Sequence, residues 1–169
     1  YPTDTIPGFT DALVELLPRL ENHTCSTGVK GGFIQRMKDG TWLGHVSEHV
    51  ALQLQQEAGH DMRRGKTRMV KGRTGVYNVV YGYVDEGVGL AAGHLAVRLV
   101  NHLVQPEEGF DFDAEQTTYF ARRTSVVPTG TSKMSGWRKR LYSTLARNSV
   151  DATRSFSLPP DRVVDFGAQ

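Results

Sequence analysis

The chain has 169 residues, of which 38% are hydrophobic and 22% are charged, with a formal net charge of +2 at pH 7. This length fits one domain with its own hydrophobic core plus tails, and the composition is that of an ordinary globular protein. So small a net charge does not indicate a nucleic-acid-binding domain, and no nucleic acid partner is expected. No apolar run approaches the roughly 20 residues that cross a bilayer, so no membrane partner is expected either.

The cysteine content and the N-terminal residues indicate the cellular compartment of the protein. The only cysteine, Cys25, cannot form an internal disulfide, and no signal-peptide pattern opens the sequence. Both features favour a reducing, cytoplasmic location. Because the sequence starts at Tyr1 and not at Met, we expect that residues upstream were removed or never included.

The first predicted helix covers Asp11–Leu17 and ends at Pro18, which cannot continue it. The following stretch, 21–32, is polar and carries three glycines, so it is predicted to be a loop. His23 and Cys25 lie in this loop. Because Cys25 has no evident acid-base partner in the sequence, we interpret it as a structural thiol.

The longest predicted helix runs from about Trp42 to Ala58. Thr41 can act as its N-cap, and Gly59 ends it. At 100° per residue, apolar side chains such as Val46 form one stripe of this helix and leave the opposite side free for polar groups.

A basic segment, a strand and a second long helix follow. Residues 60–75 hold six Lys and Arg against one acid and are predicted to be a loop or hairpin. Residues 76–84 are rich in β-branched and aromatic side chains and are predicted to be a strand, while 88–104 form a helix that packs on it. The fold class is therefore α+β: a small mixed domain with a long motif-bearing helix, a central strand or hairpin, and a second long helix packed on the sheet.

The character of the sequence changes after Val104. Residues 106–113 are acidic, and 121–169 hold nine Lys and Arg against three acids and are rich in Ser and Thr. We therefore expect a domain at 1–104 and, at 105–169, an acidic linker with a basic tail that is flexible or needs a partner to fold.

The pattern His45-Val-Ser-Glu48-His49 lies inside the long predicted helix. Histidines four residues apart stand one turn above each other, so both imidazoles can reach one Zn²⁺ ion. Glu48 is then the candidate general base that takes a proton from a bound water, as in inverted-motif zinc peptidases. The alternative is that both histidines are ordinary polar-face residues.

A catalytic zinc needs a third protein ligand, and the sequence leaves its identity open. The candidates are His23 in the glycine-rich loop, Glu57 two turns beyond His49, and His60 past the helix end. Gln53, at the next four-residue step after His49, is a poor zinc ligand.

Several sequence blocks around this motif resemble the N-terminal domain of cyanophycin synthetases, in the same order and with similar gaps. The blocks are His23–Gly28, Gly31–Phe33, Gly40–Leu52, Gly65–Arg68 and Gly75–Val80, with Ile6–Phe9 and Ala96–Leu99 also fitting. The resemblance covers about residues 5–104, and we find none beyond Val104. The strand-forming residues that usually precede the first block in this family are missing here.

The resemblance implies a domain that handles cyanophycin, a β-Asp-Arg polymer, in some members by metal-dependent hydrolysis that cuts the polymer into primers. It also implies membership of an ATP-dependent amino-acid ligase, whose ATP-grasp and Mur-ligase-like domains are absent from this sequence. The ion implied is Zn²⁺, with no organic cofactor. Where family members often carry a glutamate, this chain has Gln53, which weighs against hydrolysis.

The second hypothesis is a non-catalytic polymer-binding or scaffolding module. Basic side chains of the segment would meet the polymer's carboxylates. The residues predicted to do so are Arg63, Arg64, Lys66 and Arg68. Under either hypothesis we expect a homo-oligomer or contact with other synthetase domains.

Overall fold

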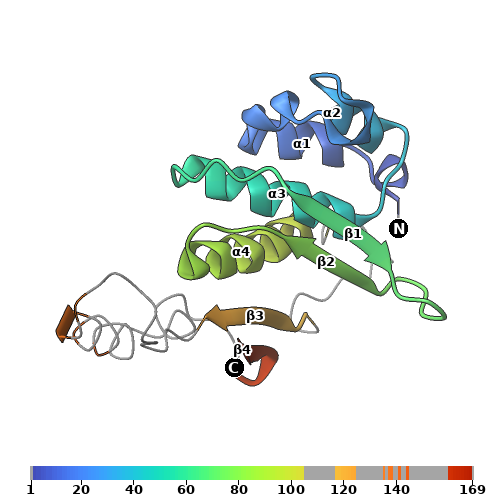
Figure 1. Cartoon of the computed structure of the whole chain (residues 1–169). Helices are drawn as coiled ribbons and strands as arrows, with labels where there is room; N and C mark the ends of the chain where they lie inside the picture. The colour runs from blue at the N-terminus through green and yellow to red at the C-terminus, as the bar shows by residue number, and fades with distance from the viewer. Residues whose placement is uncertain are drawn as a thin grey trace. The chain divides into compact units, whose positions relative to one another are not determined.

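The computed structural model describes residues 2–104, 117–124, 135, 137, 138, 141, 144 and 160–168 (Figure 1). The chain divides into two compact units, residues 1–117 and 118–169. The helices and strands of the first unit are α1 (Phe9–Leu16), α2 (Gly32–Lys38), α3 (Leu43–Glu57), β1 (Gly65–Met69), β2 (Tyr77–Tyr81) and α4 (Glu86–Val104). Helices and strands mix and the helices pack on the strands, which confirms the predicted α+β class.

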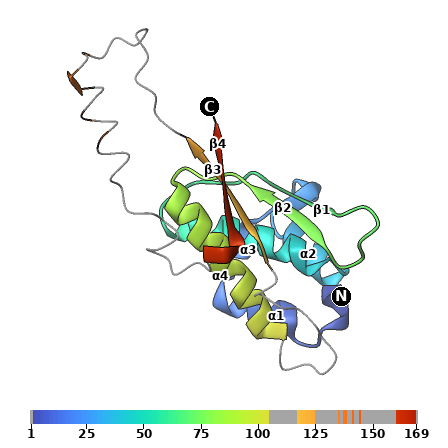
Figure 2. The same ribbon diagram turned by 90° about the horizontal axis from the view of Figure 1, so that it is seen from below.

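Helix α3 runs through the middle of this unit, between the α1–α2 pair and α4, with the two strands alongside (Figure 1). Figure 2 gives a second view, turned by 90°, of helices α3 and α4, which pack on each other. Strands β1 and β2 pair antiparallel, with Gly65 opposite Tyr81 and Met69 opposite Tyr77. The hairpin lies against α3, and this arrangement brings the basic segment close to the motif-bearing helix.

The apolar stripe of α3 faces the core, as its periodicity predicts. Val46 and Val50 are fully buried and pack with α4 residues such as Val100. Fully buried Phe33 and Met37 bring α2 to the same cluster. Burial of this stripe fixes the rotation of α3, so its polar face points toward the loop after α1 and toward β1.

The N-terminal segment is bound to the turn between α2 and α3. Pro2 pairs with Trp42 in an isolated β-bridge, and the N–H of Thr3 donates to the carbonyl of Thr41 at 2.7 Å. The buried Thr3 hydroxyl donates to the carbonyl of Met37 at 2.6 Å. These bonds hold the start of α3 in place.

Helix α4 is long and apolar enough, by length and composition alone, to be a candidate membrane span, and it is the only such helix in the part of the chain that the structure describes. Polar residues such as Arg98 interrupt its apolar sequence. Ala96, Val100 and Val104 lie in the core cluster. Core helices meet the same test, so this single match is weak evidence, and we assign α4 as a core helix.

In the second unit, β3 (Tyr119–Thr124) pairs parallel with β4 (Val163–Ala168), from Tyr119 opposite Val163 to Thr124 opposite Ala168. A short 3-10 turn, Pro160–Arg162, leads into β4. The predicted acidic linker at 106–113 and most of the predicted tail lie outside the described residues.

Candidate metal centre

Helix α3 presents His45 and His49 from successive turns, and their ring centroids lie 4.8 Å apart. Phe33 of α2 covers both. Its ring stacks on His49 at 3.9 Å with an interplanar angle of 13°, and it meets His45 edge to face at 5.7 Å. The two histidines predicted to share a helix face are therefore together, with one side closed by an aromatic ring.

Cys25 joins these histidines from the loop after α1. Its Sγ lies 3.5 Å from Nε2 of His45, and the ligand atoms of Cys25, His45 and His49 all lie within 4.8 Å of one another. Zinc bonds of about 2.3 Å to sulfur and 2.1 Å to nitrogen, at a tetrahedral angle, place such atoms about 3.5 Å apart. The three residues thus form a group that could hold a metal ion.

Backbone geometry sets Cys25 apart from its neighbours. Its φ is 50°, the only positive value at a non-glycine residue among those described. This left-handed conformation is sterically unfavourable for a residue with a Cβ, and such strain tends to occur at functional sites. The strained backbone at Cys25 thus coincides with its place beside His45 and His49, a grouping that the sequence interpretation of a structural thiol did not predict.

The hydroxyl of Thr41 holds the ring of His45. Thr41 Oγ1 lies 2.9 Å from His45 Nδ1, which orients the ring and leaves Nε2 to face Cys25. The predicted N-cap role of Thr41 is wrong. The N-cap of α3 is Trp42, which makes no side-chain capping bond. The Thr41 hydroxyl contacts His45 instead of capping the helix.

The structure separates the candidates that the sequence left open for a third ligand. His23 lies close, with Nδ1 at 2.8 Å from Nδ1 of His49, but its Nε2 is engaged with Gln53 Oε1 at 3.0 Å. Glu57 accepts a hydrogen bond from Gln53 Nε2 at 2.7 Å. His60 follows the end of α3 and is not in the metal-capable group.

Burial keeps the histidines neutral. It lowers the pKa of His49 to about 3, helped by the neighbouring His45 and His23. The pKa of His45 is lowered by burial and by the positive charge of Arg36. Neutral imidazoles are the form that binds a metal, so these rings need to lose no proton to act as ligands at neutral pH.

Glu48 faces the strand side of α3. Its Oε2 accepts a hydrogen bond of 2.6 Å from Thr67 of β1, and only 5% of the residue is exposed. Burial raises the pKa of this carboxyl, and the hydrogen bond from Thr67 partly opposes the rise. Gly65 leaves room for the carboxylate, because a Cβ there would lie 2.5 Å from Glu48 Oε1. The described metal-capable group does not include Glu48.

The four predicted polymer-binding residues are all exposed: Arg63 and Arg64 directly before β1, and Lys66 and Arg68 on it. Arg63 forms an exposed ion pair with Asp61 at 2.7 Å. Lys66 and Arg68 alternate with Thr67, whose side chain bonds Glu48, so the two cations share the outer face of β1.

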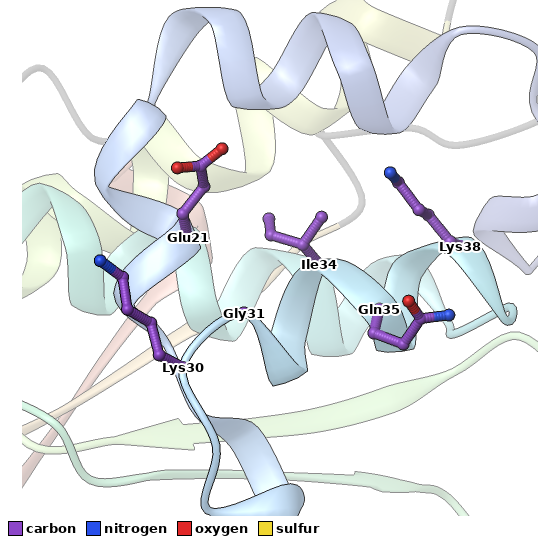
Figure 3. A pocket seen from close by; sticks show the side chains of 6 residues that line it. All are labelled: Glu21, Lys30, Gly31, Ile34, Gln35 and Lys38. Carbon is purple, nitrogen blue, oxygen red and sulfur yellow. The ribbon is translucent and has the colours of Figure 1, made fainter.

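A shallow depression lies between α2 and the turn after α1 (Figure 3). It is lined by Glu21, Lys30, Gly31, Ile34, Gln35 and Lys38. None of these side chains belongs to the metal-capable group, so the depression is distinct from the histidine site.

Comparison with known proteins gives two family matches. Residues 1–105 match the cyanophycin synthase-like N-terminal domain. The chain belongs to this family. It is 50% identical over 103 residues to the cyanophycin synthetase of Crocosphaera subtropica, covering 61% of this chain and 12% of that relative. It is 42% identical over 131 residues to the enzyme of Trichormus variabilis, covering 75% of this chain and 14% of the relative.

The second match covers residues 54–169 and is to the K+ potassium transporter C-terminal domain, so the chain belongs to that family too. This match extends past Val104, beyond which the sequence blocks alone showed no resemblance. A probable potassium transport system protein Kup of Anaeromyxobacter is 52% identical over 54 residues, covering 32% of this chain and 8% of the relative. The chain thus spans only a small part of the length of these cyanophycin synthetases and of this potassium transport protein.

Proposed function

We propose that the first unit binds cyanophycin, the β-Asp-Arg polymer, and hydrolyses it at a zinc site formed by Cys25, His45 and His49. The observation that carries this proposal is the grouping of these three donors within 4.8 Å. Glu48, buried on the same helix, supplies a carboxyl. Family membership supports the choice of polymer.

The donor set suits zinc. One thiolate and two imidazoles leave a fourth tetrahedral position open, which is the arrangement of catalytic zinc sites. A zinc ion held there would polarise the scissile amide carbonyl and make a bound water more acidic. Thr41 orients His45, and Phe33 shields His49 from bulk water.

Glu48 is the general base of this proposal. It follows His45 by three residues on the helix, so the two side chains are neighbours on the surface of α3. A raised pKa makes its carboxylate a better proton acceptor than an exposed glutamate. Glu48 takes a proton from the attacking water and delivers it to the leaving amine nitrogen as the amide C–N bond breaks.

The exposed cations of the hairpin supply the attraction for the polymer. Lys66 and Arg68 lie on the outer face of β1, the strand whose Thr67 bonds Glu48. Carboxylates along the polymer would pair with these cations and bring an amide toward Glu48. Exposed pairs are weakened by salt, so polymer binding should weaken as ionic strength rises.

Metal content and polymer cleavage test the proposal together. The purified chain should bind about one equivalent of Zn²⁺, and zinc-loaded chain should release soluble peptides from cyanophycin. Glu48→Gln should keep the metal and lose cleavage, whereas Glu15→Gln, at an exposed position of α1, should keep both. A chain that binds no zinc, or that cleaves nothing when loaded, would refute the hydrolase function.

A non-catalytic polymer-binding module is the second candidate. The observation that favours it is the Thr67 hydrogen bond, which holds the Glu48 carboxylate against β1. The chain would then be retained on insoluble cyanophycin at low salt and release no product. Both candidate functions share three further expectations. These are contact with the ligase domains of a longer cyanophycin synthetase, self-association, and a cytoplasmic location.

We propose separately that the second unit is a folding module of the K+ potassium transporter C-terminal type. The support is the family match that extends to residue 169 and the division of the chain at residue 117. Expression of residues 118–169 alone, followed by circular dichroism and thermal melting, tests whether this unit folds without the first.

A further inference from the structure

A chain of side-chain contacts runs along α3 and ends at His49. Arg19 pairs with Glu57 at 3.4 Å, and Gln53 Nε2 donates to the same carboxylate at 2.7 Å. The side-chain amide oxygen of Gln53, Oε1, lies 3.0 Å from His23 Nε2. His23 Nδ1 in turn lies 2.8 Å from His49 Nδ1. Gln53 is completely buried, so its amide cannot turn to water for other partners.

The hydrogen bond between Gln53 and Glu57 sets the direction of the others. The Glu57 carboxylate only accepts, so the NH₂ group of Gln53 must face it and the Gln53 oxygen must face His23. That oxygen also only accepts, so the proton lies on Nε2 of His23. The two ring nitrogens of His23 face Gln53 Oε1 and His49 Nδ1, and no carboxylate in the described contacts balances a charge on this ring, so the ring is neutral and its Nδ1 carries a lone pair.

Two lone pairs cannot face each other at 2.8 Å, and therefore Nδ1 of His49 must carry the proton that His23 accepts. His49 is neutral as well, since it is only 7% exposed and its described contacts, with His23, His45 and Phe33, include no carboxylate to balance a charge. Its single proton is then used at Nδ1, and Nε2 is left with a free lone pair. This is the form of imidazole that binds a metal ion.

We propose that Gln53 and His23 are positioning residues that fix the proton of His49 on Nδ1 and so keep its Nε2 nitrogen ready to bind the metal. This inference rests on the proposed zinc site. It gives Gln53 a function that a glutamate could not perform in the same contacts, because a second carboxylate would face Glu57 without a proton to donate. Gln53 therefore acts through His49 and need not be a ligand itself.

The tautomers can be read directly on the full chain freed of metal. In ¹⁵N-histidine-labelled protein, proton–nitrogen correlation spectra distinguish imidazoles protonated at Nδ1 from those protonated at Nε2. We expect His49 to carry its proton on Nδ1 and His23 on Nε2. A spectrum with the His49 proton on Nε2 would overturn the inference.

Two matched variants separate positioning from general packing. Gln53→Leu removes the relay, whereas Gln55→Leu removes a second buried amide of α3, which donates to Gly82. We expect Gln53→Leu to give His49 a mixture of tautomers and to lower zinc affinity about tenfold or more, as loss of supporting hydrogen bonds does at metal sites. Gln55→Leu should change neither the tautomer nor the affinity.

The outcomes also distinguish this inference from the proposed function. Unchanged tautomers and unchanged zinc affinity in Gln53→Leu would refute the positioning role while leaving the zinc site standing. A wild-type chain with His49 protonated on Nδ1 that binds no zinc would instead refute the zinc site and, with it, the metal-binding purpose of the relay.

Discussion

Glu48 and Gly65 meet where β1 crosses α3. An added Cβ at Gly65 would lie 2.5 Å from Oε1 and 2.7 Å from Cδ of Glu48, too close for either atom to stay in place. The Glu48 side chain is flexible, whereas the β1 backbone is held by its ladder with β2. A substitution at Gly65 should therefore displace the carboxylate more than the strand.

We predict that Gly65→Ala lowers polymer cleavage by tenfold or more while its midpoint of urea unfolding stays close to that of the wild type. Displacing a general base by about 1 Å is enough for a loss of this size. Gly72→Ala is a poor control, because Gly72 has a positive φ; Val80→Ala, at an exposed position of the paired strand β2, is the better one. Equal cleavage by Gly65→Ala and wild type would argue against Glu48 as the base.

The buried histidines make stability depend on pH. Burial lowers the pKa of His49 from 6.5 to about 3, and it lowers the pKa of His23 and His45 as well. Between these pH values the unfolded chain binds more protons than the folded chain. The free energy of unfolding must therefore fall as the pH drops below about 6.5, by at most about 1.4 kcal/mol per pH unit for each histidine.

Urea unfolding of metal-free protein at pH 7 and pH 5 checks this prediction. The wild type should lose on the order of 2 kcal/mol between them, most of it from the histidines. His102→Gln should behave like the wild type, because His102 is exposed on α4. Equal stability at the two pH values would mean that the histidines are not held neutral by the fold.

At the scale of elements, α2 contributes two buried residues with different neighbours. Phe33 stacks on His49. Met37 is equally buried, and its main-chain carbonyl accepts hydrogen bonds from the Thr3 hydroxyl and the Gly40 N–H. Replacing either by leucine keeps an apolar side chain of similar size. Such swaps in a core usually cost less than about 1.5 kcal/mol.

We predict that Phe33→Leu and Met37→Leu lose similar stability but differ at the metal. Only Phe33→Leu removes the ring that packs flat on His49, so only it should weaken zinc binding, by several-fold. Calorimetric zinc titration and thermal melting of both variants measure the two effects. Equal zinc affinity in the two variants would show that the stacked ring does not hold His49.

The long helix could be predicted closely from the sequence, because its boundaries are set locally. The expected range from Trp42 to Ala58 became α3 at Leu43–Glu57, with the predicted apolar stripe buried. The pairing of His45 with His49 followed from the same helical spacing. Local periodicity carries this information because neighbouring turns of one helix need no tertiary contact.

The rest of the site depends on contacts that no local pattern encodes. Cys25 reaches His45 across 20 residues because a loop of unusual backbone geometry returns to α3. Thr67 reaches Glu48 across 19 residues because β1 packs on the same helix. The sequence did show Cys25 and His23, two residues of metal-binding type, close together in a glycine-rich loop. Their spacing alone could not show that this loop contacts the helix that carries His45 and His49.

At the scale of the whole molecule, every residue of the proposed metal site and relay lies in the first unit. The site draws on the loop after α1, on α2, α3 and β1, all of which precede residue 117. The second unit contributes β3 and β4, which pair with each other.

We therefore predict that a chain shortened to residues 1–117 keeps the α+β fold and binds zinc within about twofold of the full chain's affinity, because ligands and their supporting hydrogen bonds are retained. Far-ultraviolet circular dichroism and competitive zinc titration measure both properties. If the shortened chain unfolds or loses zinc, the two family matches reflect one interdependent structure, and the overlap of the matches at 54–105 would mark the residues that both parts need.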